Sequence, residues 1–244
     1  MKTSKTIYLA IISRATGHWP MFNSIQAAAA HIMKRGYRIK IVPHVGDSLL
    51  CRGRQNLFHS YLNDPDKPEY LFTLDDDIEV PYDIFDMLID AQKPIIGGVY
   101  RLKKDFDPKP EDEINLYNYL AFRKHPDYDV ILGDEKPVEV TYVSTGCILY
   151  TREFCQRMWD AYPELSYKDN VTKEEKRALY MTMIEPNDLE YLSEDWAFCW
   201  RAKAIGEKIW LHPNVLCNHW GLKDYNSVEF VNKVIDWQAS QKDS

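Results

Sequence analysis

Tyr70-Leu-Phe-Thr-Leu-Asp-Asp-Asp77 combines an apolar run of strand length with three successive carboxylates. The apolar part predicts a buried β-strand, because runs of aromatic and aliphatic side chains suit the interior of a sheet. Three adjacent acids repel one another and lose hydration when a fold draws them in. A bound cation would neutralise them, and ligands of open α/β sheets bind at the carboxyl ends of strands. The stretch therefore predicts a divalent-metal site at the edge of a sheet, beside a phosphate-bearing ligand.

A helix cap is the simpler explanation of the same three acids. The segment Val80–Asp90 has a helical pattern, with Pro81 in its first turn. Acidic side chains stabilise the N-terminus of a helix, and Asp is a good N-cap residue. This stretch alone leaves both interpretations open.

The composition indicates a folded protein. The chain has 244 residues, of which 45% are hydrophobic, and a net charge of −7. This charge disfavours a broad surface for nucleic acid. The five cysteines form no CxxC pair, which predicts buried thiols in a reducing compartment. No apolar run has the length of a signal or transmembrane segment, so we expect a cytoplasmic protein.

Strand and helix patterns alternate through the first hundred residues. This alternation predicts an α/β fold with a mostly parallel central sheet and helices on both faces. The later part is less regular, and we expect an insertion at 103–137 and a loop at 162–189. The expected strands are 6–12, 37–42, 70–74, 94–100, 138–143, 148–150 and 208–211, and the expected helices are 24–34, 50–62, 80–90, 151–159, 193–206 and 228–239.

Three further groups could contribute to a site, and each also has a structural explanation. Glu194-Asp195 could supply a general base or could stabilise the start of a helix after Ser193. His219 could ligate a metal, for which nitrogen favours Mn²⁺ over Mg²⁺, or could be a structural histidine. Arg52 and Arg54 could bind phosphate at a helix N-terminus or could form ordinary ion pairs.

Taken together, these residues resemble the GT-A glycosyltransferases, which are metal-dependent nucleotide-sugar transferases. Asp75-Asp76-Asp77 matches the Asp-x-Asp motif, Glu194-Asp195 matches a late acidic pair that opens a helix, and His219 matches a terminal histidine. The segments 46–48, 52–56 and 96–100 look like those of smaller bacterial and viral members. The resemblance extends from about residue 7 to residue 221.

The resemblance implies a single Rossmann-like domain over residues 1–244. Residues 1–101 would form the nucleotide-sugar-binding half and residues 102–221 the acceptor-binding and catalytic half. Residues 222–244 would add a C-terminal helix and tail.

The same resemblance implies roles for individual residues. Asp77 would ligate Mn²⁺ or Mg²⁺, with Asp75, directly or through water, and His219 as further ligands. Asp195 would be the general base if the reaction inverts the anomeric centre, and would position the acceptor if it retains it, with Glu194 beside it. Asp76 occupies the variable middle position of the motif. The implied substrate-binding residues are Arg14, Asp47, Arg52, Arg54, Asp75, Asp76, Thr145, Gly146 and Trp196.

The implied activity is transfer of a hexosyl or pentosyl group from a nucleoside-diphosphate sugar, with uridine diphosphate as the default carrier. The acceptor would be a hydroxyl of a glycan, a lipid-linked sugar or another molecule, with nucleic acid left open. A non-catalytic nucleotide-sugar or glycan-binding domain is the alternative. A phosphatase of the haloacid dehalogenase type fits less well, since its pattern has Thr or Val where this chain has Glu79.

Overall fold

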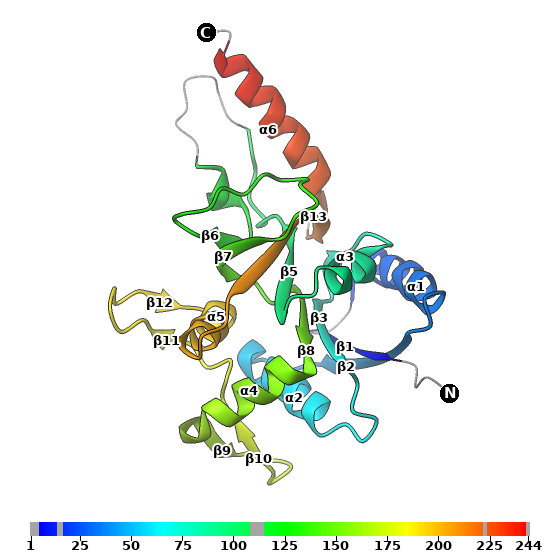
Figure 1. The fold of residues 1–244 in the computed structure, drawn as a ribbon, viewed down its shortest axis with the longest axis vertical. Helices are drawn as coiled ribbons and strands as arrows, with labels where there is room; N and C mark the ends of the chain where they lie inside the picture. The colour runs from blue at the N-terminus through cyan, green and yellow to red at the C-terminus, as the bar shows by residue number, and fades with distance from the viewer. Residues whose placement is uncertain (1–4, 14–16, 108–114, 222–223, 243–244) are drawn as a thin grey trace.

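The computed structural model describes residues 5–13, 17–107, 115–221 and 224–242, and its central element is one large sheet (Figure 1). The strands lie in the order β2-β1-β3-β8-β5-β13-β7-β6, and β4 and β14 pair with β13 off this path. Their bounds are β1 (Thr6–Ser13), β2 (Arg38–Val45), β3 (Tyr70–Asp75), β4 (Ile78–Glu79), β5 (Ile95–Tyr100), β6 (Phe122–Lys124), β7 (Val138–Val143), β8 (Cys147–Thr151), β13 (Ile209–Trp220) and β14 (Asp224–Tyr225).

The N-terminal part of the sheet is parallel. β1 pairs in parallel with β2 and β3, and β5 pairs in parallel with β13. The later strands β6, β7 and β8 join in antiparallel orientation, with β8 between β3 and β5. The expected α/β class, with its largely parallel central sheet and flanking helices, is confirmed. The carboxyl ends of β1, β2 and β3 consequently meet at one edge.

Helices cover both faces of the sheet, and alternate residues of β1 contribute to the two cores. The core that contains Ile7 and Leu9 includes residues of α1 (Trp19–Met33) and α3 (Ile84–Asp90). The core that contains Tyr8 and Ala10 includes residues of α2 (Leu50–Leu62), α4 (Arg152–Ala161), α5 (Glu194–Ala204) and α6 (Ser227–Lys242). None of the described helices has the length and apolar character needed to cross a membrane.

Two expectations about the later elements were wrong. The segment 162–189 contains a 3-10 helix, η2 (Pro163–Leu165), and strands of two small hairpins, β9 (Ser166–Lys168) with β10 (Glu175–Arg177) and β11 (Met183–Ile184) with β12 (Tyr191–Leu192). The strand expected at 208–211 continues as β13 to Trp220, because an irregularity between Leu211 and Leu216 lets pairing with β5 resume. Within 103–137, η1 (Leu116–Tyr119) and β6 are the described regular elements.

The five cysteines are free thiols, as their spacing predicted. Cys147, Cys155, Cys199 and Cys217 are buried, and Cys51 in α2 is partly exposed. The Sγ atoms of Cys147 and Cys217 lie 3.6 Å apart between β8 and β13.

Candidate active site

The two chain segments that carry Asp77 and His219 meet at the carboxyl edge of the sheet. β3 ends at Asp75, and the chain turns through Asp76 and Asp77 into β4, which pairs with the end of β13. The backbone N–H of Trp220 donates to the carbonyl of Asp77 at 2.8 Å. This pairing brings His219 Nε2 to 3.5 Å from Asp77 Oδ2.

The helix-cap interpretation of the three acids is wrong. The next helix, α3, begins at Ile84, and its N-cap residue is Asp83. The acidic residue in its first turn is Asp86. Asp75, Asp76 and Asp77 therefore lie outside the cap, and each of them contacts residues of other elements.

Asp77 is held by two cationic or potentially cationic groups. Lys103 Nζ lies 2.6 Å from its Oδ2, the same oxygen that faces His219. Burial alone would raise the pKa of Asp77, but the hydrogen bonds from His219 and Lys103 outweigh it and lower the pKa to about 2. The carboxylate is therefore charged at neutral pH. The sequence did not predict the contact with Lys103.

His219 is oriented by a backbone carbonyl. Its Nδ1 lies 2.7 Å from the carbonyl oxygen of Arg101, so Nδ1 carries a proton and donates. With Nδ1 donating to this carbonyl, Nε2 faces Asp77 Oδ2: when protonated it donates to that oxygen, and when neutral it offers its lone pair to a cation, as in metal-ligating histidines with a fixed tautomer. The imidazole also packs edge-to-face on Tyr100, with ring centroids 5.4 Å apart.

Asp77 and His219 fit a divalent ion as an incomplete ligand set. Their facing oxygen and nitrogen are 3.5 Å apart, a spacing that suits neighbouring ligands of one cation. No cluster of three or more His, Cys, Asp or Glu side chains suited to a metal occurs among the described residues. The remaining ligands would have to come from a bound molecule and water, as is usual for Mg²⁺ held with phosphates.

Arg54 joins the two acidic motifs. It is 5% exposed in α2, and its Nη1 and Nη2 lie 2.9 and 3.1 Å from the two carboxylate oxygens of Asp75. Its Nε lies 3.6 Å from Glu194 Oε1. Burial opposes its charge, but the field of Asp75 and Glu194 raises the pKa of Arg54 above its usual range. We expected Arg54 beside the base or phosphate of a donor, whereas its guanidinium lies between these carboxylates.

Glu194 and Asp195 open α5 in different environments. Ser193 is the N-cap residue, yet its hydroxyl makes no cap hydrogen bond and donates instead to Asp195 Oδ1. The backbone N–H of Trp196 donates to the same oxygen at 2.9 Å. Both of these hydrogen bonds go to Oδ1, and among the described residues no side chain or backbone group is recorded donating to Oδ2. Burial, and then the charge of Asp195, raise the pKa of Glu194.

Gly146 lies against both the Asp-x-Asp motif and a buried tyrosine. A Cβ at Gly146 would be 2.6 Å from Tyr100 Oη and 2.8 Å from Asp75 Oδ2. The Gly146 carbonyl accepts from Asp75 N at 2.9 Å, and the Thr145 carbonyl accepts from Thr73 Oγ1 at 2.7 Å. Burial, followed by the charge of Asp75, raises the pKa of Tyr100 well above its usual value. The sequence reasoning missed Tyr100, although it ends an expected strand at the same sheet edge.

Asp76, the middle acid, points back to the first strand. It accepts a hydrogen bond from the hydroxyl of Ser13, and its pKa is raised, chiefly by burial. Trp196 stacks on Tyr142, with ring centroids 5.1 Å apart, and the guanidinium of Arg123 lies 4.4 Å from the Trp196 ring. These aromatic rings form a wall beside the start of α5.

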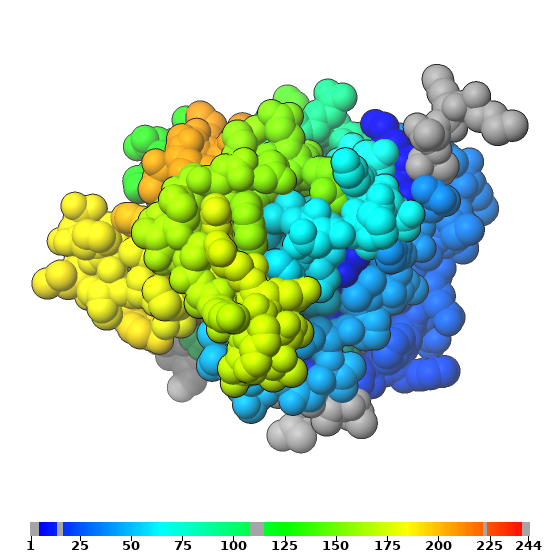
Figure 2. Space-filling model, turned by 90° about the horizontal axis from the view of Figure 1, so that it is seen from below, coloured from blue at the N-terminus to red at the C-terminus, as the bar shows by residue number. Residues whose placement is uncertain are grey.

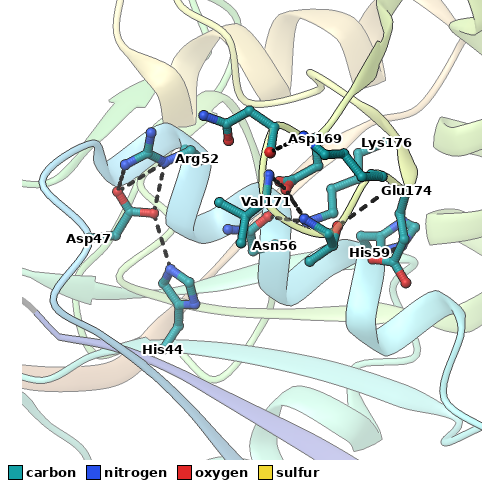
Figure 3. Close-up of polar contacts among 12 residues, drawn as sticks. His44, Asp47, Arg52, Asn56, His59, Asp169, Val171, Glu174 and Lys176 are labelled. Atoms are coloured by element: carbon teal, nitrogen blue, oxygen red, sulfur yellow. Dashed lines mark hydrogen bonds and ion pairs between the residues drawn. The ribbon is translucent and has the colours of Figure 1, made fainter.

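Asp47 and Arg52 form an ion pair at the end of β2 (Figure 3). Arg52 Nη2 lies 2.7 Å from Asp47 Oδ1, and His44 Nε2 lies 3.2 Å from Asp47 Oδ2. The pair lines a hollow of 370 Å³ together with Asn56 and Lys176. Asp47 and Arg52 therefore contact each other rather than the acid cluster. Arg14, which we expected near a nucleoside, lies outside the described residues.

Comparison with known proteins supports the fold. No family model matches the chain, and no curated protein matches it in sequence. The crystal structure of A197 from STIV is similar, with a TM-score of 0.51 and 14% identity over 89% of this chain and 86% of that chain. The chain has a GT-A-like α/β fold, as its motifs led us to expect.

Two solved glycosyltransferases show weaker similarity. GalNAc-T7 with UDP, GalNAc and Mn²⁺ has a TM-score of 0.48 and 11% identity, over 90% of this chain and 44% of that chain. A Drosophila β1,4-galactosyltransferase 7 mutant in complex with manganese, UDP-Gal and xylobiose has a TM-score of 0.41 and 13% identity, over 85% of this chain and 66% of that chain. At such identities the likeness concerns the fold and leaves the activity of this chain to be argued from its own residues.

Proposed function

We propose that this chain is a divalent-metal-dependent glycosyltransferase. It moves a sugar from a nucleoside-diphosphate sugar, with uridine diphosphate as the default carrier, to an acceptor hydroxyl. One observation carries the proposal. Side chains from distant parts of the sequence converge on one sheet edge, where Asp77 faces His219, 142 residues further along the chain, at 3.5 Å, and Arg54 lies between Asp75 and Glu194. This edge is where α/β sheets bind their ligands.

In this proposal, Asp77 and His219 hold the metal. Their mixed oxygen and nitrogen donors favour Mn²⁺ over Mg²⁺. The bound ion would neutralise the charge that develops on the departing nucleoside diphosphate. Asp77 remains ionised because its pKa is about 2. Lys103 lies on the same carboxylate oxygen and adds a positive charge beside the expected position of the diphosphate.

Asp195 is the proposed general base. Ser193 and the Trp196 backbone fix its Oδ1, which leaves Oδ2 to take the proton of the acceptor hydroxyl. Trp196, stacked on Tyr142, would form part of the acceptor wall. Glu194 would position Arg54, since the two side chains pair through Nε.

The donor would occupy the half of the chain formed by residues 1–101, and the acceptor the half formed by residues 102–221. Gly146 lets Asp75 Oδ2 and Tyr100 Oη lie against the backbone, where a Cβ would clash with both, so it shapes the proposed donor site at Asp75. The other proposed donor contacts are Arg14, Asp47, Arg52, Asp76 and Thr145.

A thermal-shift panel tests the proposal. The probes are UDP, GDP, CDP and their sugars, each with and without Mn²⁺. A ligand that binds only the folded chain adds about 2.7 kcal/mol of stability at a hundredfold excess over Kd. We expect one nucleotide to raise Tm only with Mn²⁺, and Asp77→Asn to abolish the rise. Asp83→Asn, which changes an acid without a cap hydrogen bond, is the matched control and should respond like the unaltered chain.

Two results would count against the proposal. A flat panel at saturating nucleotide and Mn²⁺ would remove the donor site altogether. Binding of a nucleotide sugar without release of its nucleoside diphosphate, across glycan and aryl acceptors, would make the chain a non-catalytic binding domain.

A further inference from the structure

A second hollow shares Arg52 with the hollow that Asp47 lines. It has a volume of 460 Å³ and lies between the N-terminal half of α2 and the segment 164–181. Its walls are mainly apolar and include Leu49, Tyr167, Ala178 and Met181. Figure 2 shows the hairpin of β9 and β10, in yellow-green, lying on the surface against the segments of α2 and α4. This volume is in the range of small-molecule sites.

Two apolar side chains at this hollow are open to solvent. Leu49 is 51% exposed and Met181 is 47% exposed. They belong to different parts of the chain, the start of α2 and the segment after β10, and both line the hollow. An apolar ligand between them would remove both surfaces from water, which is favourable.

The hollow also contains a buried amide with an unused donor. Gln55 is 2% exposed, and its Oε1 accepts from the backbone N–H of Leu179 at 2.9 Å. That hydrogen bond fixes the orientation of the amide. Among the described residues, Gln55 Nε2 has no hydrogen-bond partner. A buried donor without a partner costs stability, and a ligand with an acceptor atom would satisfy it.

Cys51 connects the hollow to the acid cluster. Cys51 lines the hollow, and the carboxylates of Glu194 and Asp47 both act on its thiol, whose pKa is raised chiefly by burial. On the same helix, Arg54 pairs with Asp75 and approaches Glu194. The N-terminal part of α2 therefore contributes both to the hollow, through Cys51 and Gln55, and to the acid cluster, through Arg54.

We propose that this hollow binds the non-sugar part of the acceptor, a compact apolar ring system that carries a carbonyl or similar hydrogen-bond acceptor. The inference rests on the proposed glycosyl transfer and adds the class of acceptor to it. The apolar walls fit a ring, and Gln55 Nε2 supplies the donor for its acceptor atom. Arg52, Gln55, Glu164 and Ser166 are the polar residues that line the hollow, and the rest of the wall, which is apolar, would leave saccharide hydroxyls without partners.

The test measures binding before any transfer. The probe is 4-methylumbelliferone, a fluorescent fused-ring phenol with a lactone carbonyl, and the comparison is 2-naphthol, which has a similar ring system and hydroxyl but no carbonyl. Fluorescence titration should give saturable binding of 4-methylumbelliferone, with 2-naphthol about tenfold weaker for the loss of one hydrogen bond to a buried donor. This comparison uses the unaltered protein and is independent of any effect of mutation on folding.

Two further measurements locate the binding. Ala178→Phe fills the hollow and should abolish saturable binding, whereas Ala239→Phe, at an exposed position of α6, should leave it unchanged. In the unaltered protein, 4-methylumbelliferone should slow alkylation of Cys51 by iodoacetamide, since Cys51 lines the hollow and the other four thiols are buried. Equal binding of both probes, binding that survives Ala178→Phe, or unprotected Cys51 would overturn the inference.

Failure of this inference and failure of the proposed function give different results. If 4-methylumbelliferone binds in the hollow but no nucleotide sugar is bound or consumed, the hollow is a ligand site and glycosyl transfer is wrong. If a nucleotide sugar binds with Mn²⁺ but the probe does not bind, the donor site stands and the apolar acceptor is wrong.

Discussion

Arg54 and Arg52 lie in the same turn of α2, but we expect them to contribute very differently to the free energy of unfolding. Both form ion pairs with aspartates, but the Arg54 side chain is 4% exposed and the Arg52 side chain 46%. Exposed pairs gain little because water and salt screen them. A buried pair with one partner removed leaves an uncompensated charge away from water. In this structure, loss of Arg54 would leave the partly buried carboxylates of Asp75 and Glu194, 25% and 18% exposed, without their cation.

We therefore predict that Arg54→Met lowers the free energy of unfolding by about 1.5–3 kcal/mol, because it removes the charged hydrogen-bond partner of partly buried carboxylates. Arg52→Met should cost only about 0–1 kcal/mol, as expected for an exposed pair. Urea unfolding of the two variants measures the difference. Equal losses in both would show that Arg54 is not the buried link between the two acidic motifs.

At this scale, the sequence could predict which residue types gather but not which of them pair. Asp77 and His219 each follow an expected strand, so their meeting at one edge follows from the topology. The pairing of Arg54 with Asp75 depends on which side of α2 faces the sheet. The contact of Lys103 with Asp77 and that of Tyr100 with Gly146 depend on the direction in which each side chain points. Hydrophobic periodicity does not predict that direction.

Among the elements, the hairpin of β9 and β10 is held to α2 by one buried lysine, which the composition of the hairpin does not predict. Lys176 is 4% exposed, and its Nζ lies 2.7 Å from Asn56 Oδ1 on α2 and 3.0 Å from Asp169 Oδ2 (Figure 3). Asp169 also accepts from the backbone N–H groups of Val171 and Thr172, both at 2.8 Å. One buried lysine thus ties the turn of the hairpin to a helix of the core.

We predict that Lys176→Met releases the hairpin from α2, because it removes the ammonium that both Asn56 and Asp169 contact. Amide hydrogen exchange at residues 166–177 should become faster, while exchange in β1 and β3 stays unchanged. Lys168→Met alters an exposed lysine of the same hairpin and is the control. If the amides of residues 166–177 exchange at the same rate in Lys176→Met and Lys168→Met, then Lys176 does not anchor the hairpin.

The same elements show what periodicity can and cannot locate. The bounds of α2, Leu50–Leu62, agree with the expected helix because its apolar residues face one core. β13 was expected to end at residue 211, since Pro213 and Asn214 interrupt the apolar run. The irregularity in its pairing with β5 absorbs this interruption. The hairpins in 162–189 consist of two- and three-residue strands, which are too short to give a pattern.

For the whole molecule, one buried histidine, His212, and one partly buried histidine, His59, predict how stability depends on pH. Burial lowers the pKa of His59 in α2 and of His212 in β13 below the usual value. The unfolded chain takes up protons on these rings as pH falls below about 6.5, whereas the folded chain does so only at lower pH. Folding therefore loses stability as pH decreases through this window and keeps it above.

We predict that His212→Gln reduces the slope of unfolding free energy against pH between pH 7 and pH 5, by at most about 1.4 kcal/mol per pH unit. The measurement is urea unfolding at several pH values, and the comparison is the difference between the variant and the unaltered chain. His125, whose side chain lies at the surface, provides the control as His125→Gln. A slope that His212→Gln leaves unchanged would contradict the prediction.

The position of β13 has a consequence for how the molecule is made. This strand lies between β5 and β7 in the sheet, yet it is formed by residues 209–220 of 244. During synthesis, β5 and β7 leave the ribosome well before the strand that joins them, so a growing chain presents two open strand edges. His219 arrives with the same strand. Truncated chains that stop before it would lack both the strand that joins β5 to β7 and the proposed second metal donor, so we expect a chain released early to be aggregation-prone and to lack the proposed activity.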